Sequence, residues 1–272
     1  MHLKFKKNKT VIMGVLNVTP DSFSDGGQFF TIDYAIARAK QLVEEGADIV
    51  DIGGESTRPG SNVVDADEEL NRVAPVIEQL AKEITVPISI DTYKPAVAKT
   101  CLERGAGMIN DISGLRYENG KMLEVAATHQ VPVCIVHMEG LPKTMQQEPK
   151  YHDLVSEIKD FFIERVKVAK LAGIKDENII LDPGIGFGKT VEHNLILLQR
   201  LNEFTELGFP LLIGTSRKSF IGKISDLPAE QRLEGTIASN VLAIIKGAKI
   251  VRVHDVLEHK RALEIIDAIK SA

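Results

Sequence analysis

Short apolar runs recur along the chain, and a stretch with helical periodicity follows each of them. Eight runs have the length of a strand and are rich in Val and Ile, and they span residues 10–17, 48–54, 87–91, 107–111, 131–137, 178–184, 210–216 and 249–254. Strands that are buried on both faces of a parallel sheet are apolar along most of their length instead of alternating strictly. The pattern therefore predicts eight parallel strands that alternate with helices.

The stretches between these runs carry apolar side chains on one helical face. Residues 65–84 have apolar positions at a three-four spacing, and Asp65 with Glu68 forms a capping pair at the start. The last helix repeats the device with Asp255 and Glu258 as its capping pair. Its apolar stripe consists of Leu263, Ile266 and Ile269.

Eight strands that alternate with helices either close into a (βα)8 barrel or open into a doubly wound sheet. The chain has 272 residues, which suits a single barrel of roughly 250 residues. We therefore predict a single α/β domain over residues 1–272, folded as a (βα)8 TIM barrel. Residues 1–9 form a short N-terminal lead-in.

Composition narrows the possible partners. A net charge of −5 argues against a nucleic-acid-binding protein, which needs a basic face. No stretch approaches the ~18 uninterrupted apolar residues of a membrane span, and no signal peptide is visible. The two cysteines, Cys101 and Cys134, form no CxxC pair and indicate no disulfide framework. We expect a cytoplasmic protein that binds neither nucleic acid nor membranes.

Nearly every predicted strand ends in a polar or charged residue. These residues are Asn17, Asp51, Glu55, Asp91, Asn110, Asp111, His137, Asp182, Ser216, Arg217, Lys218, Arg252 and His254. In a barrel the carboxyl ends of all eight strands meet at one rim, where barrel enzymes build their active sites. The sequence therefore predicts an active site at this rim.

The charges at this rim are divided along the chain. Lys218, Arg252 and His254 follow the last two strands, where barrels often bind phosphate, whereas Asp91 and Asp182 lie on the opposite arc. A carboxylate accepts two parallel N–H bonds from an amide- or amidine-like edge. The division therefore favours a ligand with such an edge and a phosphate tail.

One glycine-rich segment resembles a nucleotide-binding loop but does not match its motif. The segment DPGIGFGKT (182–190) ends like a Walker A motif, but Pro183 stands where that motif requires its first glycine. A second loop, within 13–27, is rich in Thr, Ser, Asp and Gly, as lids on barrel rims often are.

Several segments together resemble the dihydropteroate synthase family. They are GVLNVTPDSFSDGG, DIGGESTRPG, SIDTYKP, NDISG, HMEGLPKTMQ, DPGIGFGKT, GTSRKSFIG and VRVHDV, in the family's order across essentially the whole chain. The resemblance implies a Mg2+-assisted transferase that condenses 6-hydroxymethyl-7,8-dihydropterin diphosphate with p-aminobenzoate. The products are 7,8-dihydropteroate and pyrophosphate. It also implies a sulfonamide target and a homodimer, formed through the helices around 229–246.

The resemblance also implies roles for individual residues. The pterin-binding residues are Asp91, Asn110, Met138, Asp182, Phe187, Gly214 and Lys218. The diphosphate-binding residues are Asn17, Thr57, Arg252 and His254, with Asn17 also a Mg2+ ligand. The p-aminobenzoate-binding residues are Phe23, Ser24, Thr57, Arg58, Pro59, Lys218 and Ser219. The catalytic residues are Asp25, Lys218, Arg252 and His254.

Two alternative functions share the predicted fold. One is a methyltetrahydrofolate-dependent methyltransferase, which needs no anion site, and the other is a non-catalytic pterin-binding paralogue. We expect Arg217 to make a structural or rim contact while Lys218 points into the barrel mouth. His259 is expected at the surface.

Overall fold

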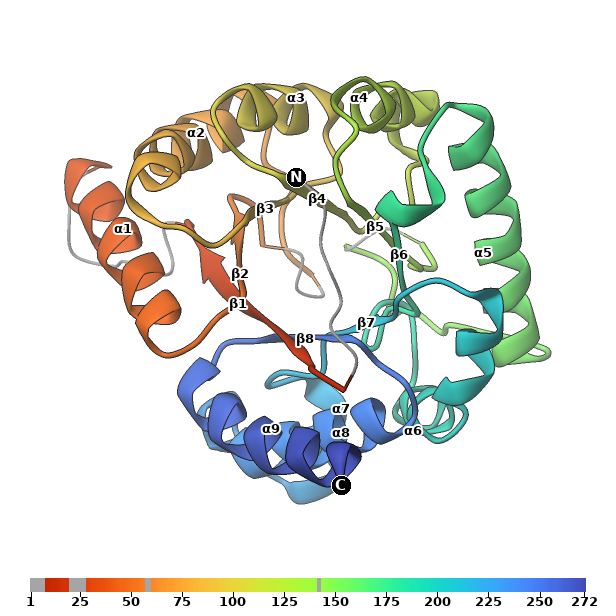
Figure 1. Ribbon diagram of the computed structural model, residues 1–272. Helices are drawn as coiled ribbons and strands as arrows, with labels where there is room; N and C mark the ends of the chain where they lie inside the picture. Colours follow the sequence, from red (N-terminus) through yellow and green to blue (C-terminus); the bar gives the residue numbers. More distant parts are fainter. Residues whose placement is uncertain (1–7, 20–27, 57–59, 141–142) are drawn as a thin grey trace.

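A ring of parallel strands forms the centre of the molecule in the computed structural model, which describes residues 8–19, 28–56, 60–140 and 143–272. The strands are β1 (Val11–Asn17), β2 (Ile49–Gly53), β3 (Ile88–Asp91), β4 (Met108–Asp111), β5 (Val133–Val136), β6 (Ile179–Asp182), β7 (Leu212–Ile213) and β8 (Ile250–Val253). Strand β1 pairs with both β2 and β8, and a bridge between Leu181 and Leu211 joins β6 to β7. The predicted (βα)8 barrel is confirmed (Figure 1).

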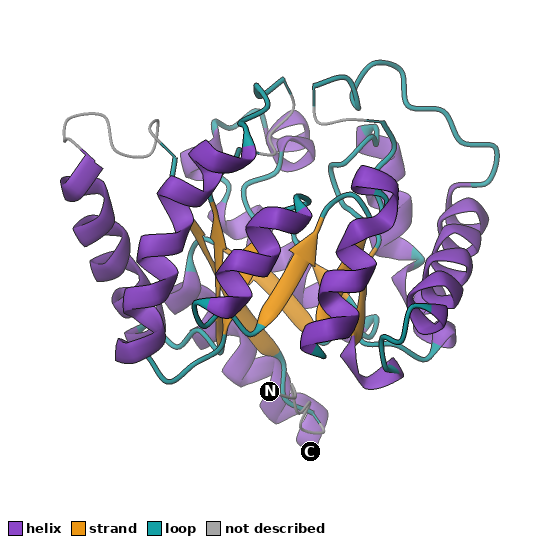
Figure 2. Ribbon diagram, turned by 90° about the horizontal axis from the view of Figure 1, so that it is seen from above, coloured by secondary structure: helices purple, strands orange, loops and turns teal. Residues whose placement is uncertain are grey.

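Helices surround the barrel. They are α1 (Gln28–Glu44), α2 (Ala66–Glu83), α3 (Pro95–Glu103), α4 (Lys121–His129), α5 (Leu154–Leu171), α6 (Val191–Gln199), α7 (Ser219–Ser225), α8 (Leu233–Ile245) and α9 (Val256–Ser271). Figure 2 shows long loops at the end toward which the strand arrows point. None of the helices in the described ranges is long and apolar enough to cross a membrane.

The alternation of side chains along each strand divides the core into two parts. One cluster of buried side chains fills the barrel interior and includes Met13, Ile49, Met108, Ile180 and Ile250. The other lies between the strands and the helices and includes the intervening strand residues. Because side chains two apart share a face, the inward positions can be followed to the rim of the barrel.

The two predicted capping pairs have different outcomes. Asp65 is the N-cap of α2 and accepts a hydrogen bond from the Glu68 backbone N–H at 2.8 Å, as predicted. Asp255 precedes α9 but makes no side-chain capping bond there, so this prediction is wrong. Its carboxylate instead binds the Arg217 guanidinium, a charged partner that the start of the helix would not provide. On the predicted apolar stripe of α9, the side chain of Ile269 is 66% exposed, so this position does not face the core.

The amino-terminal end of the barrel is joined to the last helix. The Asp267 carboxylate on α9 accepts hydrogen bonds from the backbone N–H and the hydroxyl of Thr10, both at 2.9 Å. Thr10 is buried immediately before β1, so its donors need this partner. The contact fixes the start of the chain's first strand against its last helix.

We expect Asp267→Ala to lower the free energy of unfolding by about 2 kcal/mol, because it leaves two donors of Thr10 without an acceptor. Urea unfolding measures this change. Asp160→Ala, which removes an exposed carboxylate on α5, is the matched control and should change stability by less than about 0.5 kcal/mol. Equal stability of the two variants would contradict the role of Asp267.

Candidate active site

Four polar side chains project into the barrel mouth from neighbouring inward positions. Asp51 stands two residues after Ile49, Asn110 two after Met108, and Asp182 two after Ile180, each following an interior residue. Asp91 belongs to the same inward set, because Ile88 and Ile90 lie in the outer cluster. All four are buried. The period of the strands thus gathers three carboxylates and one amide at the rim.

Arg252 reaches across the barrel from β8 to these carboxylates. It stands two residues after the interior Ile250, and its Nε donates to Asp51 Oδ2 and its Nη2 to Asp91 Oδ2, both at 2.6 Å. Although burial acts to lower the pKa of Arg252, the carboxylates Asp51 and Asp91 raise it above its usual value. The guanidinium is therefore permanently charged in this position.

Several acceptors in the mouth have no donor. Asn110 donates a hydrogen bond from Nδ2 to Asp51 Oδ2 at 3.1 Å, so Asn110 Oδ1 points away from Asp51. In the described part of the chain, Asn110 Oδ1, Asp51 Oδ1 and Asp91 Oδ1 are buried without a hydrogen bond. Buried polar atoms normally have partners. Burial also raises the pKa of Asp91, against the opposing effect of Arg252. The cluster is therefore suited to a ligand rich in N–H groups.

The neighbours Arg217 and Lys218 point in different directions, as predicted. Arg217 forms a two-pronged ion pair with Asp255, with its Nε 3.0 Å from Oδ2. Lys218 Nζ lies 4.3 Å from the centre of the Phe187 ring and donates to the carbonyl oxygen of Ile185. Burial lowers the pKa of Lys218 to about 8, although Asp182 favours its charged form.

Lys189 supports the loop that carries Phe187. Its side chain is 3% exposed, and its Nζ lies 3.0 Å from both the Phe187 carbonyl oxygen and His137 Nδ1. Burial lowers the pKa of Lys189 to about 7 and that of His137 to about 2. Gly184 completes the turn with φ of +72°, and a Cβ there would lie 1.9 Å from the His137 carbonyl oxygen. The loop is thus built around a buried amine.

The remaining predicted residues lie around the same mouth where the structure describes them. Asn17 ends β1 and is half-buried, Met138 belongs to the interior cluster, and Phe187 packs against it. His254 Nδ1 lies 2.9 Å from Ser216 Oγ after β8. Gly214 and Ser219 follow β7, with Ser219 opening α7. The predicted loop residues Phe23, Ser24, Asp25, Thr57, Arg58 and Pro59 lie outside the described residues.

Sequence reasoning missed three contributions. Asp51 was noted only as a strand-end residue, although it contacts both Arg252 and Asn110. Lys189 was considered only as part of a failed Walker A motif. His259 is fully buried, which contradicts its predicted surface position, because its ring bridges Asn240 Nδ2 at 3.1 Å and the Asp255 carbonyl oxygen at 2.7 Å. The alternation of side chains could have identified Asp51 as an inward residue.

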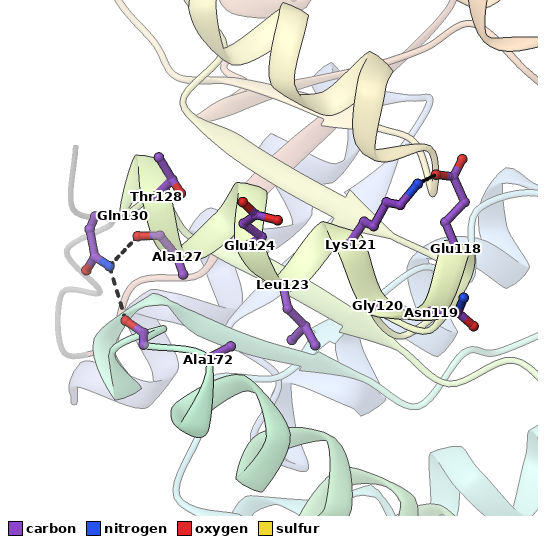
Figure 3. Close-up of a pocket in the computed structure, with 11 residues that line it drawn as sticks. Glu118, Asn119, Gly120, Lys121, Leu123, Glu124, Ala127, Thr128, Gln130 and Ala172 are labelled. Carbon is purple, nitrogen blue, oxygen red and sulfur yellow. Dashed lines mark hydrogen bonds and ion pairs between the residues drawn. The ribbon is translucent and has the colours of Figure 1, made fainter.

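A groove of about 630 Å³ lies elsewhere, on the outside of the barrel beside α4 (Figure 3). Its wall includes the ion pair of Lys121 with Glu118, and Gln130, which donates to the Ala127 carbonyl oxygen at 2.6 Å. None of the inward-facing strand-end residues lines this groove. Its lining is mixed and offers no grouping of catalytic side chains.

Comparison with known families identifies the kind of barrel. Residues 13–254 match the family model described as pterin binding enzyme. The dihydropteroate synthase of Bacillus subtilis (strain 168) is 50% identical over 263 residues, covering 97% of this chain and 90% of that protein. The dihydropteroate synthase of Escherichia coli (strain K12) is 49% identical, covering 96% of this chain and 92% of that protein.

Solved structures agree with these relatives. The Yersinia pestis dihydropteroate synthase in a sulfonamide complex has a TM-score of 0.93 at 45% identity and covers all of both chains. The Xanthomonas albilineans dihydropteroate synthase in complex with 7,8-dihydropteroate has a TM-score of 0.88 at 42% identity, covering 97% of this chain and 95% of that chain. The predicted resemblance is confirmed. These relatives are synthases, so they do not support the methyltransferase alternative.

We expect the stability contributed by Lys189 to depend on pH. Between its pKa of about 7 in the fold and the usual 10.5, the unfolded chain holds a proton on this amine that the folded chain lacks. Raising the pH through this window therefore favours the folded state of the native protein, but not that of Lys189→Met.

Urea unfolding of both proteins at several pH values between about 7 and about 10 measures the difference. The native protein should gain stability relative to the variant as the pH rises. The exposed Lys167→Met should show no such trend. A pH-independent difference for Lys189→Met would mean that the buried amine keeps an ordinary pKa.

Proposed function

The chain belongs to the pterin-binding enzyme family, within it to the dihydropteroate synthases, and from this premise we propose how its barrel mouth divides the work of the reaction. The reaction condenses 6-hydroxymethyl-7,8-dihydropterin diphosphate with p-aminobenzoate, and it releases pyrophosphate and 7,8-dihydropteroate. One substrate has a flat ring with N–H donors and a diphosphate tail. The site correspondingly has an arc of acceptors and an arc of cations.

The acceptor arc binds the pterin. Asp91, Asn110 and Asp182 accept hydrogen bonds from the amino and ring N–H groups of its pyrimidine edge. The observation that supports this most strongly is the presence of buried oxygens without donors, Asp91 Oδ1 and Asn110 Oδ1, beside the equally unpaired Asp51 Oδ1. Asp91 Oδ1 and Asn110 Oδ1 each gain a hydrogen bond when the ring enters, and such a bond contributes about 1.5–3 kcal/mol at the charged Asp91 and about 0.5–1.5 kcal/mol at the neutral Asn110.

The walls of this pocket hold the ring in place. Phe187, Met138 and Gly214 line it, and Lys218 directs its ammonium group to the pterin carbonyl and ring nitrogen. The present position of Lys218 above the Phe187 ring supports this role, because a flat ligand that lies along Phe187 comes within reach of the amine. Gly186 has φ of +83° and gives Lys218 room, since a Cβ there would lie 2.9 Å from Lys218 Cδ.

The cation arc binds the diphosphate. Arg252 and His254 donate to its oxygens, and the side-chain amide oxygen of Asn17 would hold Mg2+. The fit is good, because Asn17 is half-buried at the rim and its side chain makes no hydrogen bond to a described residue. No group of three or more His, Cys, Asp or Glu able to hold a metal occurs among the described residues. This donor set suits Mg2+, which commonly combines one or two protein ligands with substrate phosphates.

The chain's own residues assist the departure of the leaving group. The bond between the pterin methylene carbon and the diphosphate oxygen breaks first, and its electron pair leaves with the pyrophosphate. Arg252 and His254 stabilise the charge that grows on this group, and Mg2+, when bound, would supply further neutralisation as a Lewis acid. The p-aminobenzoate nitrogen then forms a bond to the methylene carbon with its lone pair and loses a proton, so no strong general base is needed.

The second substrate binds at the outer rim. Ser219 at the start of α7 contacts p-aminobenzoate, together with Phe23, Ser24, Thr57, Arg58 and Pro59, and Asp25 stabilises the cationic intermediate. Lys218 borders both substrates. A sulfonamide has the same aryl amine and an acidic group in place of the carboxylate, so it competes for this position.

The assembly is a homodimer formed through the late helices. Exposed apolar side chains gather there and are Ile224, Leu242, Ile245, Ile265 and Ile269 on α7, α8 and α9. Apolar side chains in such numbers on neighbouring helices indicate a surface that a second copy covers. The cytoplasm is the compartment, which agrees with two buried cysteines that form no disulfide.

We expect the purified protein with Mg2+ and dihydropterin diphosphate to release pyrophosphate only when p-aminobenzoate is added. A coupled pyrophosphate assay with chromatography of the product measures this. Equal amounts of pyrophosphate and dihydropteroate are the expected result. Tight binding of the pterin without turnover would instead indicate a non-catalytic pterin-binding protein.

We expect Lys218→Ala to weaken binding of the pterin diphosphate by about ten- to a hundredfold, because it removes a charge-assisted hydrogen bond in a buried site. Calorimetric titration measures the affinity, and circular dichroism checks that the fold is retained. The exposed Lys167→Ala is the matched control. An unchanged affinity in Lys218→Ala would exclude this contact.

A further inference from the structure

Asp51 is an inward residue of β2 at the mouth and has no role in binding or catalysis as described above. It is fully buried, and one of its carboxylate oxygens, Oδ2, accepts from two residues of the proposed site. Arg252 Nε donates to it at 2.6 Å and Asn110 Nδ2 at 3.1 Å. A single atom thus connects a cation-arc residue on β8 with an acceptor-arc residue on β4.

The contact of Arg252 with Asp51 differs from its contact with Asp91. Nε lies on the side of the guanidinium next to the aliphatic stem, whereas Nη2, which binds Asp91, lies at the far end. No described residue accepts a hydrogen bond from the other terminal nitrogen, Nη1. The side chain of Arg252 retains 22% exposure. Asp51 therefore holds the inner edge of the guanidinium and leaves its outer end able to exchange partners.

Asp91 is the partner that the substrate would exchange. The pyrimidine edge of a pterin, with an amino group beside a ring N–H, presents the same pair of donors as a guanidinium. Pterin and Arg252 therefore compete for the Asp91 carboxylate, and a buried cation that loses one partner needs another anion. The diphosphate of the same substrate is that anion.

We propose that Asp51 is the positioning residue of this site: it holds Arg252 by Nε while Nη2 moves from Asp91 to the substrate's diphosphate. Pterin binding thereby directs a cation to the leaving group. Asp51 also holds the Asn110 amide with Nδ2 inward, which leaves Oδ1 as the acceptor for the ring. The proposal rests on the proposed function, because it assumes a substrate with both a pterin and a diphosphate.

A double-mutant cycle tests whether Asp51 acts through Arg252. Asp51→Asn keeps the shape of the side chain but removes its charge, so we expect kcat to fall by about ten- to a hundredfold in the native background. In the Arg252→Ala background the same change should lower kcat by less than about twofold, because the residue to be positioned is absent. An equal loss in both backgrounds, or none in the native one, overturns the proposal.

Asp111→Asn is the matched control. Asp111 is a buried aspartate at the end of β4, but it faces away from the interior and accepts from the backbone N–H groups of Ser113 and Leu115. We expect this variant to lose stability without a loss of kcat. If thermal unfolding shows that Asp51→Asn loses kcat only in proportion to its folded fraction, the role is structural and the proposal fails.

A second readout of the cycle does not depend on turnover. Calorimetric titration with inorganic pyrophosphate and Mg2+ should show weaker binding to Asp51→Asn than to the native protein, by about fivefold or more, and no further weakening when Arg252→Ala is already present. If the native protein binds pyrophosphate with this coupling but forms no dihydropteroate, the proposed function fails and the role of Asp51 stands. If the native protein forms dihydropteroate but the variants show no such coupling, the proposed function stands and the role of Asp51 fails.

Discussion

Closure of the parallel sheet is the constraint on which the site depends. When β1 pairs with both β2 and β8, and the bridge between Leu181 and Leu211 joins β6 to β7, the carboxyl ends of the strands meet at one rim, and alternate side chains point into a shared interior. Apolar residues such as Ile49 and Ile250 fill that interior, and the residues two positions later carry charge. The two-residue alternation along the strands therefore determines both the apolar interior and the charged layer next to it, toward the carboxyl ends of the strands.

Burial strengthens the hydrogen bonds that this polar layer can form with a ligand. Asp51, Asp91 and Asp182 are removed from water, and Arg252 neutralises the first two only in part, since each retains an oxygen without a hydrogen bond. In a low-dielectric interior such atoms gain more from a ligand's N–H groups than they would in water. In the proposed binding mode the substrate completes the hydrogen bonding of the barrel mouth, which gives affinity and specificity for a donor-rich ring the same origin.

Much of this could be predicted from the sequence, because the strands are short, buried and separated by amphipathic helices. The strand-end residues Asp91, Asn110, Asp182 and Arg252 were found from their positions alone, and the structure places them in one mouth. The contacts among them could not be predicted. Whether Arg252 turns to a carboxylate or toward the rim depends on distances across the barrel, and no local pattern encodes these. Asp255 shows the same limit. Its carboxylate stands where it could cap α9, but in the structure it forms an ion pair with Arg217 from another loop.

We propose that the two arcs of the mouth bind the two halves of one substrate. A crystal structure of the protein with Mg2+ and dihydropterin diphosphate tests it most directly. We expect the pterin ring on Asp91, Asn110 and Asp182, and the diphosphate beside Asn17, Arg252 and His254, with Arg252 released from Asp91 but still bound to Asp51. A ring bound outside this mouth, or a diphosphate that leaves Arg252 on both carboxylates, would contradict it.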